Sequence, residues 1–369
     1  MELDLAVERA LAPGSFANPS RAYQAAARAT LDEQRFREKL RLHGSHGDAL
    51  NVESALLDRP HFVHHPVQFD QGSVLHIAAQ RGHADLARLL VQRGANVNRG
   101  DHLQKTSLHA ACETNQAVVV AELLVAGADA DLRDAMGQTP LHRAAFTGSS
   151  DALAVLLDYG AATRKRDEGG LMALHKAATM GREEALVILL ERDPMTVNLE
   201  ASDGWTALHL AAHGGHAAAC EVLLLNGSDP GALDLSGATA LHRAAAAASG
   251  DEACQVLLQC GADPGATDKS LSTPLHAACE EGRVAAASVL LAAGAATEVQ
   301  NATRRTPLRI ATEAGNLELC QALLQWDADP SSSDPGRGVP SAIAVARRAR
   351  REDLLALFES ATTRTEGDS

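Results

Sequence analysis

Apolar residues along the chain fall into short paired blocks, and the stretch "TPLHRAAFTGSSDALAVLLDYGA" at residues 139–161 shows one such pair. Its spacing of apolar positions predicts two short helices, separated by "TGSS" and closed by a glycine. One helical hairpin of this size cannot bury its own apolar side. The stretch must therefore pack against other elements of the chain.

The tetrapeptide that opens this stretch recurs along most of the chain at a nearly constant interval. Successive copies begin 33 or 34 residues apart. They read "SVLH" at 73, "TSLH" at 106, "TPLH" at 139, "MALH" at 172, "TALH" at 206 and 239, "TPLH" at 273 and "TPLR" at 306. A fixed period of this length indicates a solenoid, in which each repeat packs against its neighbours.

Each repeat uses residue types that suit two short helices and two turns. Threonine is a favourable N-cap, and proline fits the first helical position because that amide has no helical partner. An Ala-rich helix follows, and its small side chains let neighbouring helices approach closely. Glycine ends most of the second helices, as expected of a left-handed C-cap residue. These glycines are Gly94, Gly127, Gly160, Gly227, Gly261 and Gly294.

These motifs resemble the ankyrin repeat, with eight full-length copies over residues 67–330. The resemblance implies an all-α repeat solenoid of stacked helix-turn-helix units with projecting hairpin loops. Capping repeats should close both ends, since terminal repeats need a polar outer face. The expected domains are a partly helical segment at 1–39, an N-terminal capping repeat at 40–66, the repeats at 67–330, a loop and C-terminal capping repeat at 331–360, and a disordered tail at 361–369.

Three departures from the pattern predict local distortion without a break in the stack. The link "ERDPMTVNLEAS" at 191–202 lacks the glycine stop and contains Pro194. The sixth copy has an extra alanine in "RAAAAASGD" at 243–251. The eighth copy has Arg309 in place of the motif histidine.

Charge and composition narrow the classes of partner and the expected compartment. The formal net charge is -14, which disfavours nucleic acids and anionic membranes as partners because both carry negative charge. We see no apolar run of membrane-spanning length and no secretory signal, and the six cysteines lack CxxC spacing. We therefore expect an intracellular, cytoplasmic monomer with reduced thiols. The basic stretches at 164–166 and 347–351 fit nuclear-import signals, although solvated charge is the explanation that we favour.

Histidine and cysteine do not combine into a recognisable catalytic or metal site. His61, His64 and His65 are close in sequence, but no nearby cysteine or acidic pair completes a four-ligand zinc site. Five cysteines fall at small core positions, and no common catalytic or nucleotide-binding motif is present. We expect no metal, no cofactor and no enzyme activity. In the family, the motif histidine hydrogen-bonds near the threonine and the hairpin backbone; here it is His76, His109, His142, His175, His209, His242 and His276.

Positions that the repeat does not need for folding are free to specify a partner. In ankyrin arrays these are the hairpin tips and the two residues after the alanine pair, which face the concave groove. In the third to fifth copies they are Met136, Phe146, Leu171, Met180, Trp205 and His213. Aromatic residues are frequent interface hot spots, so Trp205 and Phe146 are the main candidates. Alternatively, Trp205 folds over its own hairpin and Phe146 packs against the next repeat.

The seventh and eighth copies carry Glu280, Glu281, Glu313, Arg304 and Arg305 at the corresponding positions, which predicts a polar end of mixed charge. The function that we predict is a non-catalytic scaffold that binds a protein or peptide partner through the concave groove. An alternative is a substrate-recognition subunit of a ubiquitin ligase, although we find no ligase-recruiting box after residue 360. An enzyme is a remote alternative.

Overall fold

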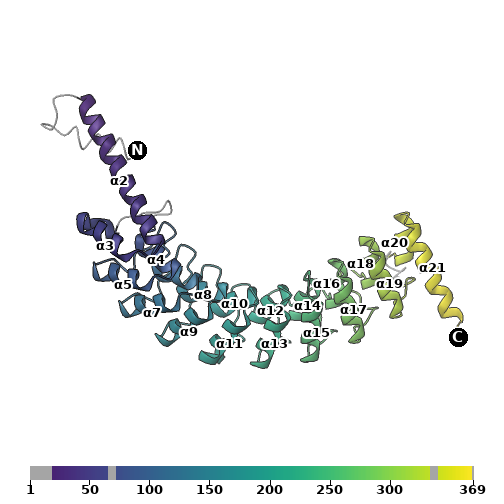
Figure 1. Cartoon of the computed structure of the whole chain (residues 1–369). Coiled ribbons are helices and arrows are strands. Elements are labelled where there is room, and N and C mark those ends of the chain that lie inside the picture. Colours follow the sequence, from purple (N-terminus) through teal and green to yellow (C-terminus); the bar gives the residue numbers. More distant parts are fainter. Residues whose placement is uncertain (1–18, 65–71, 333–339, 368–369) are drawn as a thin grey trace. The chain divides into compact units, whose positions relative to one another are not determined.

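The structure, a computed structural model, describes residues 19–64, 72–332 and 340–367 (Figure 1). Over these ranges the chain forms helices and no strand, apart from an isolated bridge between Gly100 and Thr106. The first helices are α2 (Pro19–Ser45) and α3 (Ala49–Asp58), followed by a 3-10 turn, η1 (Pro60–His64). Helix pairs then succeed one another as the repeat pattern predicts.

The helix pairs are α4 (Val74–Arg81) and α5 (Ala84–Gln92), α6 (Ser107–Glu113) and α7 (Ala117–Val125), α8 (Pro140–Thr147) and α9 (Ser150–Asp158), α10 (Ala173–Thr179) and α11 (Glu183–Arg192), α12 (Ala207–His213) and α13 (Ala217–Leu225), α14 (Ala240–Ala246) and α15 (Asp251–Gln259), α16 (Pro274–Glu280) and α17 (Val284–Ala292), α18 (Pro307–Ala314) and α19 (Leu317–Gln325), and α20 (Ala342–Arg348) and α21 (Glu352–Gly367). In the first unit α4 packs on α6 and α5 packs on α7; in the second unit α10, α12, α14, α16, α18 and α20 pack in succession, as do α11, α13, α15, α17, α19 and α21. This gives the two rows of helices that the all-α solenoid requires.

The chain divides into two compact units, and the division crosses the third repeat. The first unit comprises Met1–Ala144 and Asp151–Ala162, and the second comprises Ala145–Ser150 and Thr163–Ser369. Within the second unit, α10, α12, α14, α16 and α18 form the row of first helices (Figure 1).

The motif histidine bonds to a backbone carbonyl of the segment that leads to the next first helix, which confirms its predicted structural role at His76, His109, His175, His209, His242 and His276. In the second repeat, Nδ1 of His109 lies 2.9 Å from Oγ1 of Thr106 and accepts the Thr106 backbone N–H at 3.1 Å. Its Nε2 lies 3.0 Å from the carbonyl oxygen of Gln138, in the hairpin of the next repeat. One side chain thus caps its own helix and holds the following hairpin.

Burial keeps these imidazoles neutral. It lowers the pKa of His175 from its ordinary value near 6.5 to about 4, because a charged ring would lose its hydration inside the array. Burial lowers the pKa of the motif histidine in the same direction at His109, His209, His242 and His276. The neutral ring is also the form in which Nδ1 can accept the backbone N–H.

The core consists of small and aliphatic side chains, as the repeat pattern predicts. Cys112, Cys220, Cys254, Cys279 and Cys320 are buried, whereas Cys260 is exposed at the end of α15. Burial raises the pKa of the Cys220 thiol to about 12 and that of Cys320 to about 11. Such thiols stay protonated near neutral pH and pack as small apolar groups.

The irregular link between the fourth and fifth repeats has no glycine after its second helix. The carboxylate of Asp193 stands at the end of that helix and holds the link by hydrogen bonds. Helix α11 ends at Arg192 with Asp193 as its C-cap, and the 3-10 turn η2 (Pro194–Thr196) follows. Arg164 donates to both oxygens of Asp193, at 2.7 and 2.8 Å, and the Thr163 hydroxyl donates at 2.9 Å. Because α11 still packs on α13, the predicted distortion without a break is confirmed at this link.

The other two departures are also local. In the sixth repeat the chain leaves α14 through Ala247 in an extended conformation, and α14 still packs on α12 and α16. In the eighth repeat, Nε of Arg309 turns outward to Glu313 at 2.9 Å, while Thr306 caps α18 by accepting the Arg309 backbone N–H. Both repeats therefore keep their place in the rows.

The two ends differ from the expected domain boundaries. Helix α2 is continuous from Pro19 to Ser45, so the boundary expected between residues 39 and 40 falls inside one helix. Helix α21 continues to Gly367, past residue 361, where a disordered tail was expected to begin. Residues 333–339 of the expected loop lie outside the described residues, as do His65 and the side chain of His64.

Two glycines of the fifth repeat differ in how closely the next repeat approaches them. Both have a left-handed backbone, with φ of 69° at Gly215 and 88° at Gly227. A Cβ at Gly215 would lie 2.4 Å from the carbonyl oxygen of Ser249 in the next repeat, whereas a Cβ at Gly227 would meet nothing within 4 Å. The clash at Gly215 involves backbone, so a rotamer change cannot relieve it.

We therefore expect Gly215→Ala to destabilise the chain more than Gly227→Ala does. Gly227→Ala should cost about 1 kcal/mol for the left-handed backbone alone. Gly215→Ala should cost about 1–3 kcal/mol more, because the neighbouring turn must move. Urea unfolding of the two variants measures the difference in their free energies of unfolding. Equal decreases would show that the turn at Ser249 moves at little energetic cost.

Candidate functional site

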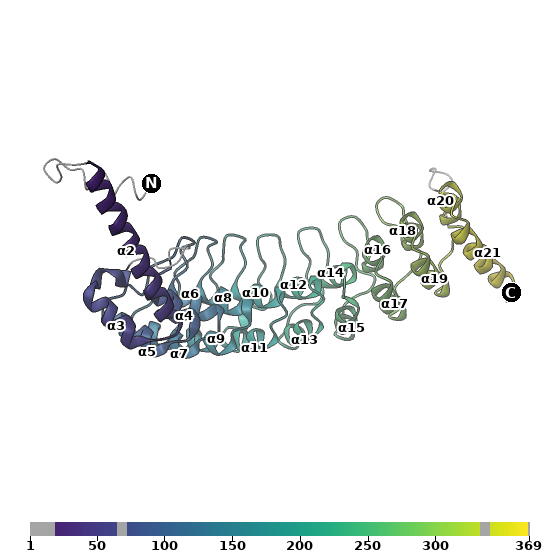
Figure 2. The same cartoon turned by 45° about the horizontal axis from the view of Figure 1, so that its top comes forward.

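The candidate site is the inner face of the second unit. We define the inner face as the surface made by the first helix of each repeat and by the hairpin that precedes it. Figure 2 shows these hairpins as a row of loops above the first helices α10, α12, α14 and α16.

A carboxylate at the base of the hairpin shapes the loop in several repeats. In the sixth repeat, Oδ1 of Asp234 accepts the backbone N–H of Ser236 at 2.8 Å and that of Ala238 at 3.0 Å. Its other oxygen, Oδ2, accepts from Nε of Arg243 at 3.0 Å. Arg243 lies nine residues after Asp234, on the first helix, so the pair ties the hairpin to the helix that it precedes.

The same arrangement occurs in two other repeats. Asp134 pairs with Arg143 at 2.5 Å in the third repeat, and Asp167 pairs with Lys176 at 2.7 Å in the fourth. Burial alone would raise the pKa of Asp134, but hydrogen bonds from Arg143 and from two backbone amides outweigh it and hold the pKa below its ordinary value. The Asp134 carboxylate is therefore charged at neutral pH.

The fifth repeat lacks this charge pair and carries a tryptophan instead. Ala201 and Leu210 stand where the other repeats have the carboxylate and the cation. Trp205, at the base of the same hairpin, has the Arg243 guanidinium 4.6 Å above its ring centroid. The ring also meets His213 edge-on, with centroids 5.2 Å apart. The indole is thus held between its own repeat and the next one.

The predicted site residues lie in both units. Met136 is exposed in the first unit, whereas Phe146, Leu171, Met180, Trp205 and His213 belong to the second. Phe146 keeps 41% of its surface exposed, and its carbonyl oxygen, rather than its ring, accepts a hydrogen bond from Arg182 at 3.3 Å. His213 is exposed, and Leu171, Met180 and Trp205 are half-buried. Their role in binding stays a prediction.

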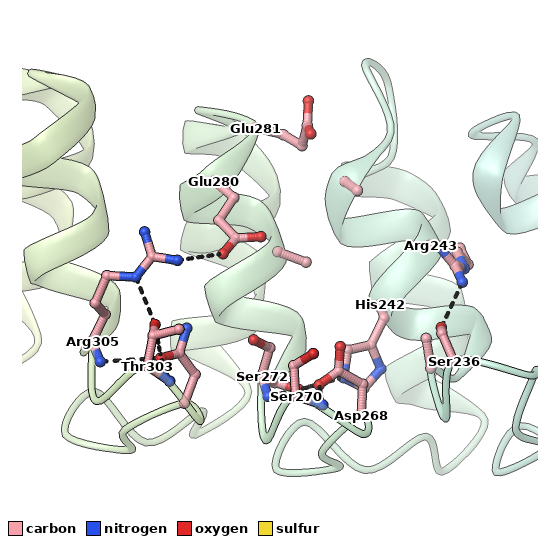
Figure 3. Close-up of a pocket in the computed structure, with 14 residues that line it drawn as sticks. Ser236, His242, Arg243, Asp268, Ser270, Ser272, Glu280, Glu281, Thr303 and Arg305 are labelled. Atoms are coloured by element: carbon pink, nitrogen blue, oxygen red, sulfur yellow. Dashed lines mark hydrogen bonds and ion pairs between the residues drawn. The ribbon is translucent and has the colours of Figure 1, made fainter.

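A cavity of about 360 Å³ opens on the inner face over the sixth to eighth repeats (Figure 3). Alanines on two first helices, Ala246 and Ala277, leave the space that it occupies. Glu280, Glu281 and Arg305 line it, so the predicted polar end of mixed charge is a hollow with charged walls. Arg305 donates to the Thr303 hydroxyl at 2.8 Å and lies 3.7 Å from Glu280.

The sequence reasoning missed two residues of this face, Arg243 and Asp268. Arg243 touches both Trp205 and Asp234, and Asp268 lines the cavity. Alignment of the repeats contains a usable signal, because an acidic residue is followed nine positions later by a cation in three of the copies. The acidic residue lies in the hairpin and the cation in the first helix, so the pair is found only when both segments are aligned across the repeats.

The chemistry of the described residues is that of recognition by charge, hydrogen bonds and apolar contact. They contain no group of three or more His, Cys, Asp or Glu side chains placed to hold a metal ion. None of the described helices combines the length and apolar character needed to cross a bilayer. Buried thiols with raised pKa values are poor nucleophiles, because the thiolate is the reactive form.

Comparison with known proteins agrees with this architecture. The family profile described as "Ankyrin repeats (3 copies)" matches residues 45–134, 118–201, 192–268 and 245–334. None of the curated proteins compared with the chain is significantly similar to it. Among solved structures, the chain resembles the crystal structure of the ankyrin repeat domain of Bcl-3, described as a unique member of the IkappaB protein family. The identity is 31% and the TM-score 0.50, over 56% of this chain and 93% of that one. The chain is therefore a member of the ankyrin-repeat family.

Proposed function

We propose that the protein is a non-catalytic scaffold that binds a protein or peptide partner through the inner face of its second unit. Ankyrin repeats generally mediate protein–protein interactions and are typically non-catalytic. The observation that carries the proposal is the exposure of Phe146 at a position that the repeat does not need for folding. Phe146 and the exposed His213 occupy equivalent first-helix positions two repeats apart.

Ordered aromatic side chains support this face as the binding surface. Aromatics make up only 3% of the chain, and Phe146 and Trp205 lie exposed or half-buried on the inner face, whereas the exposed Tyr159 and Trp326 follow second helices. Trp and Arg are enriched among interface hot spots. Trp205 and Arg243 are already stacked, so a partner that contacts them loses little side-chain entropy on binding.

The remaining parts of the proposal follow from charge and from the C-terminal helices. A net charge of -14 favours partners other than nucleic acids and anionic membranes, and we propose an intracellular monomer. Helices α20 and α21 pack on α18 and α19 as a further repeat would. This packing supports a cap at the C-terminal end more than a ligase-recruiting element.

Site-specific photocrosslinking tests the proposed face. A photoreactive amino acid replaces His213 on the inner face in one variant and Leu225 in another. Leu225 is 77% exposed at the end of a second helix, so it controls for exposure alone. In cell extract we expect a discrete covalent adduct from position 213 and none from position 225. Adducts of equal yield from both positions would contradict the proposal.

A further inference from the structure

The hairpin carboxylates of the second unit differ in whether their second oxygen has a cation. In the fourth and sixth repeats, Oδ2 of Asp167 meets Lys176 at 2.7 Å, and Oδ2 of Asp234 meets Arg243. The side chains of both carboxylates are almost fully buried. A basic side chain therefore completes the carboxylate wherever the helix supplies one nine residues later.

The seventh repeat keeps the carboxylate and lacks the cation. Oδ1 of Asp268 accepts the backbone N–H groups of Ser270 and Ser272, both at 2.8 Å, so the hairpin has the usual form. The position nine residues later is Ala277. No ion pair reaches Asp268 from any residue that the structure describes. Asp268 is half-buried, and the basic groups within its electrostatic reach include the motif histidines His242 and His276, whose pKa values are lowered by burial.

Two other repeats have lost both members of the pair, and the second repeat keeps the carboxylate without the cation. The fifth repeat replaces both members of the pair, with Ala201 and Leu210, and the eighth does so with Asn301 and Ile310. In the first unit Asp101 is followed by Ala110, but there Lys105 and Arg143 both reach the neighbouring Glu113, at 2.8 and 3.4 Å. In the seventh repeat a single cation, Arg305, reaches the equivalent Glu280, at 3.7 Å.

The missing side chain leaves an open space in front of Asp268. The cavity of about 360 Å³ is lined by Asp268, Ala277, Glu280 and Glu281, with the hydroxyls of the hairpins around it (Figure 3). The two arginines in its wall are already engaged. Arg243 is paired with Asp234 and stacked on Trp205.

Arg305, the second of these arginines, is held by three groups. It donates to the Thr303 hydroxyl and lies 3.7 Å from Glu280 and 3.3 Å from Glu313. Negative charge is therefore in excess inside the cavity, because Asp268 and Glu281 are not neutralised by these arginines. Glu281 has only Arg283, at 3.9 Å, as a described counterion.

We propose that this cavity receives an arginine or lysine side chain of the protein partner, whose cation takes the position that Lys176 and Arg243 take in their own repeats. The proposal rests on the proposed function and names the partner's chemistry. The hairpin carboxylate, fixed by two backbone amides, is already oriented, so a charge-assisted hydrogen bond forms there without rearrangement. An overall charge of -14 also steers a basic segment toward the chain.

Two substitutions test the cavity without disturbing the hairpin. Asp268→Asn removes the charge but keeps an acceptor for both amides, as Asn301 does in the eighth repeat at 3.0 and 3.1 Å. Ala277→Lys places a lysine where the fourth repeat has Lys176, so it should fill the cavity from inside. Ala277→Lys should also raise the melting temperature, and this rise should vanish when Asp268→Asn is added.

The binding experiment uses a random-peptide display library as the probe and the full chain as the target. We expect the wild-type chain to enrich peptides with a fixed arginine or lysine, and the Ala277→Lys chain to lose that preference. For a selected synthetic peptide, Asp268→Asn and Ala277→Lys should each weaken affinity about tenfold or more. Replacing the peptide's basic residue by alanine should cause a similar loss in wild type and little further loss in Asp268→Asn.

The outcomes separate this inference from the proposed function. Enriched peptides without a fixed basic residue, or peptides indifferent to Asp268→Asn, would overturn the inference and leave peptide binding at the inner face intact. A wild-type chain that enriches no peptide would overturn the inference as well. In that case the crosslinking yields at positions 213 and 225 decide whether the proposed function fails with it.

Discussion

The free energy of unfolding is expected to fall steeply as the pH is lowered from about 6.5 to about 4. Burial lowers the pKa of the motif histidine in five repeats, so in this pH range the unfolded chain binds protons that the folded chain does not. Above about pH 6.5 neither state binds them, and the stability is fully present. His175, with a pKa of about 4, should alone cost about 2 kcal/mol between about pH 7 and about pH 4.5.

Urea unfolding at a series of pH values measures this loss. His175→Gln provides the control, because it removes one titrating ring and should flatten the pH dependence. Buried carboxylates such as Asp134 also have lowered pKa values, but their stability is lost only as the pH falls below about 3.8. An unfolding free energy that is constant down to about pH 5 would contradict the prediction.

Trp205→Ala and Phe146→Ala are expected to weaken partner binding about thirty-fold or more each. Loss of a hot-spot side chain typically costs about 2 kcal/mol or more of binding free energy, which corresponds to this factor. Folding should survive, because Phe146 is 41% exposed and Arg243 remains paired with Asp234 when the indole is removed.

The measurement compares affinity and melting temperature for these variants and for two controls. Tyr159→Ala removes an exposed aromatic ring at the end of a second helix and should leave the affinity unchanged. His209→Ala removes the bonds to Thr206 and to the Ala238 carbonyl, so it should lower the melting temperature. If Trp205→Ala and Phe146→Ala melt early and still bind normally, both are packing residues.

The parts of the fold that repeat could be predicted from the sequence. Recurrence of "TPLH"-like segments located the helix pairs, since each copy must satisfy the same caps and the same neighbours. The buried Cys112 and Cys279 occupy positions where other copies have alanine, so comparison between copies also identified them as core residues. His109 followed the family pattern and bonds as expected.

Features that depend on contacts between unlike repeats were harder to predict. The stack of Arg243 on Trp205 joins two unlike repeats: the sixth has no tryptophan where the fifth has Trp205, and the fifth has Leu210 where the sixth has Arg243. The periodicity of the sequence therefore does not predict the contact. Asp193 stands at the helix end where most other repeats have a glycine, and it pairs with Arg164, which lies 29 residues earlier in the chain. The extent of α2 and α21 was missed because neither helix has a neighbouring copy with which to compare its ends.

The bond from the motif histidine toward the next repeat ends on a backbone carbonyl, as in His209 to Ala238 and His276 to Arg305. Every residue has such a carbonyl, so this joint places no demand on the side chains of the repeat that follows. Copies can therefore be duplicated, deleted or exchanged with little penalty at most junctions. The junction between the fifth and sixth repeats is an exception, because Trp205 there requires Arg243. Recombination at that point would separate the two residues and remove a cation–aromatic contact that joins no other two copies among the described residues.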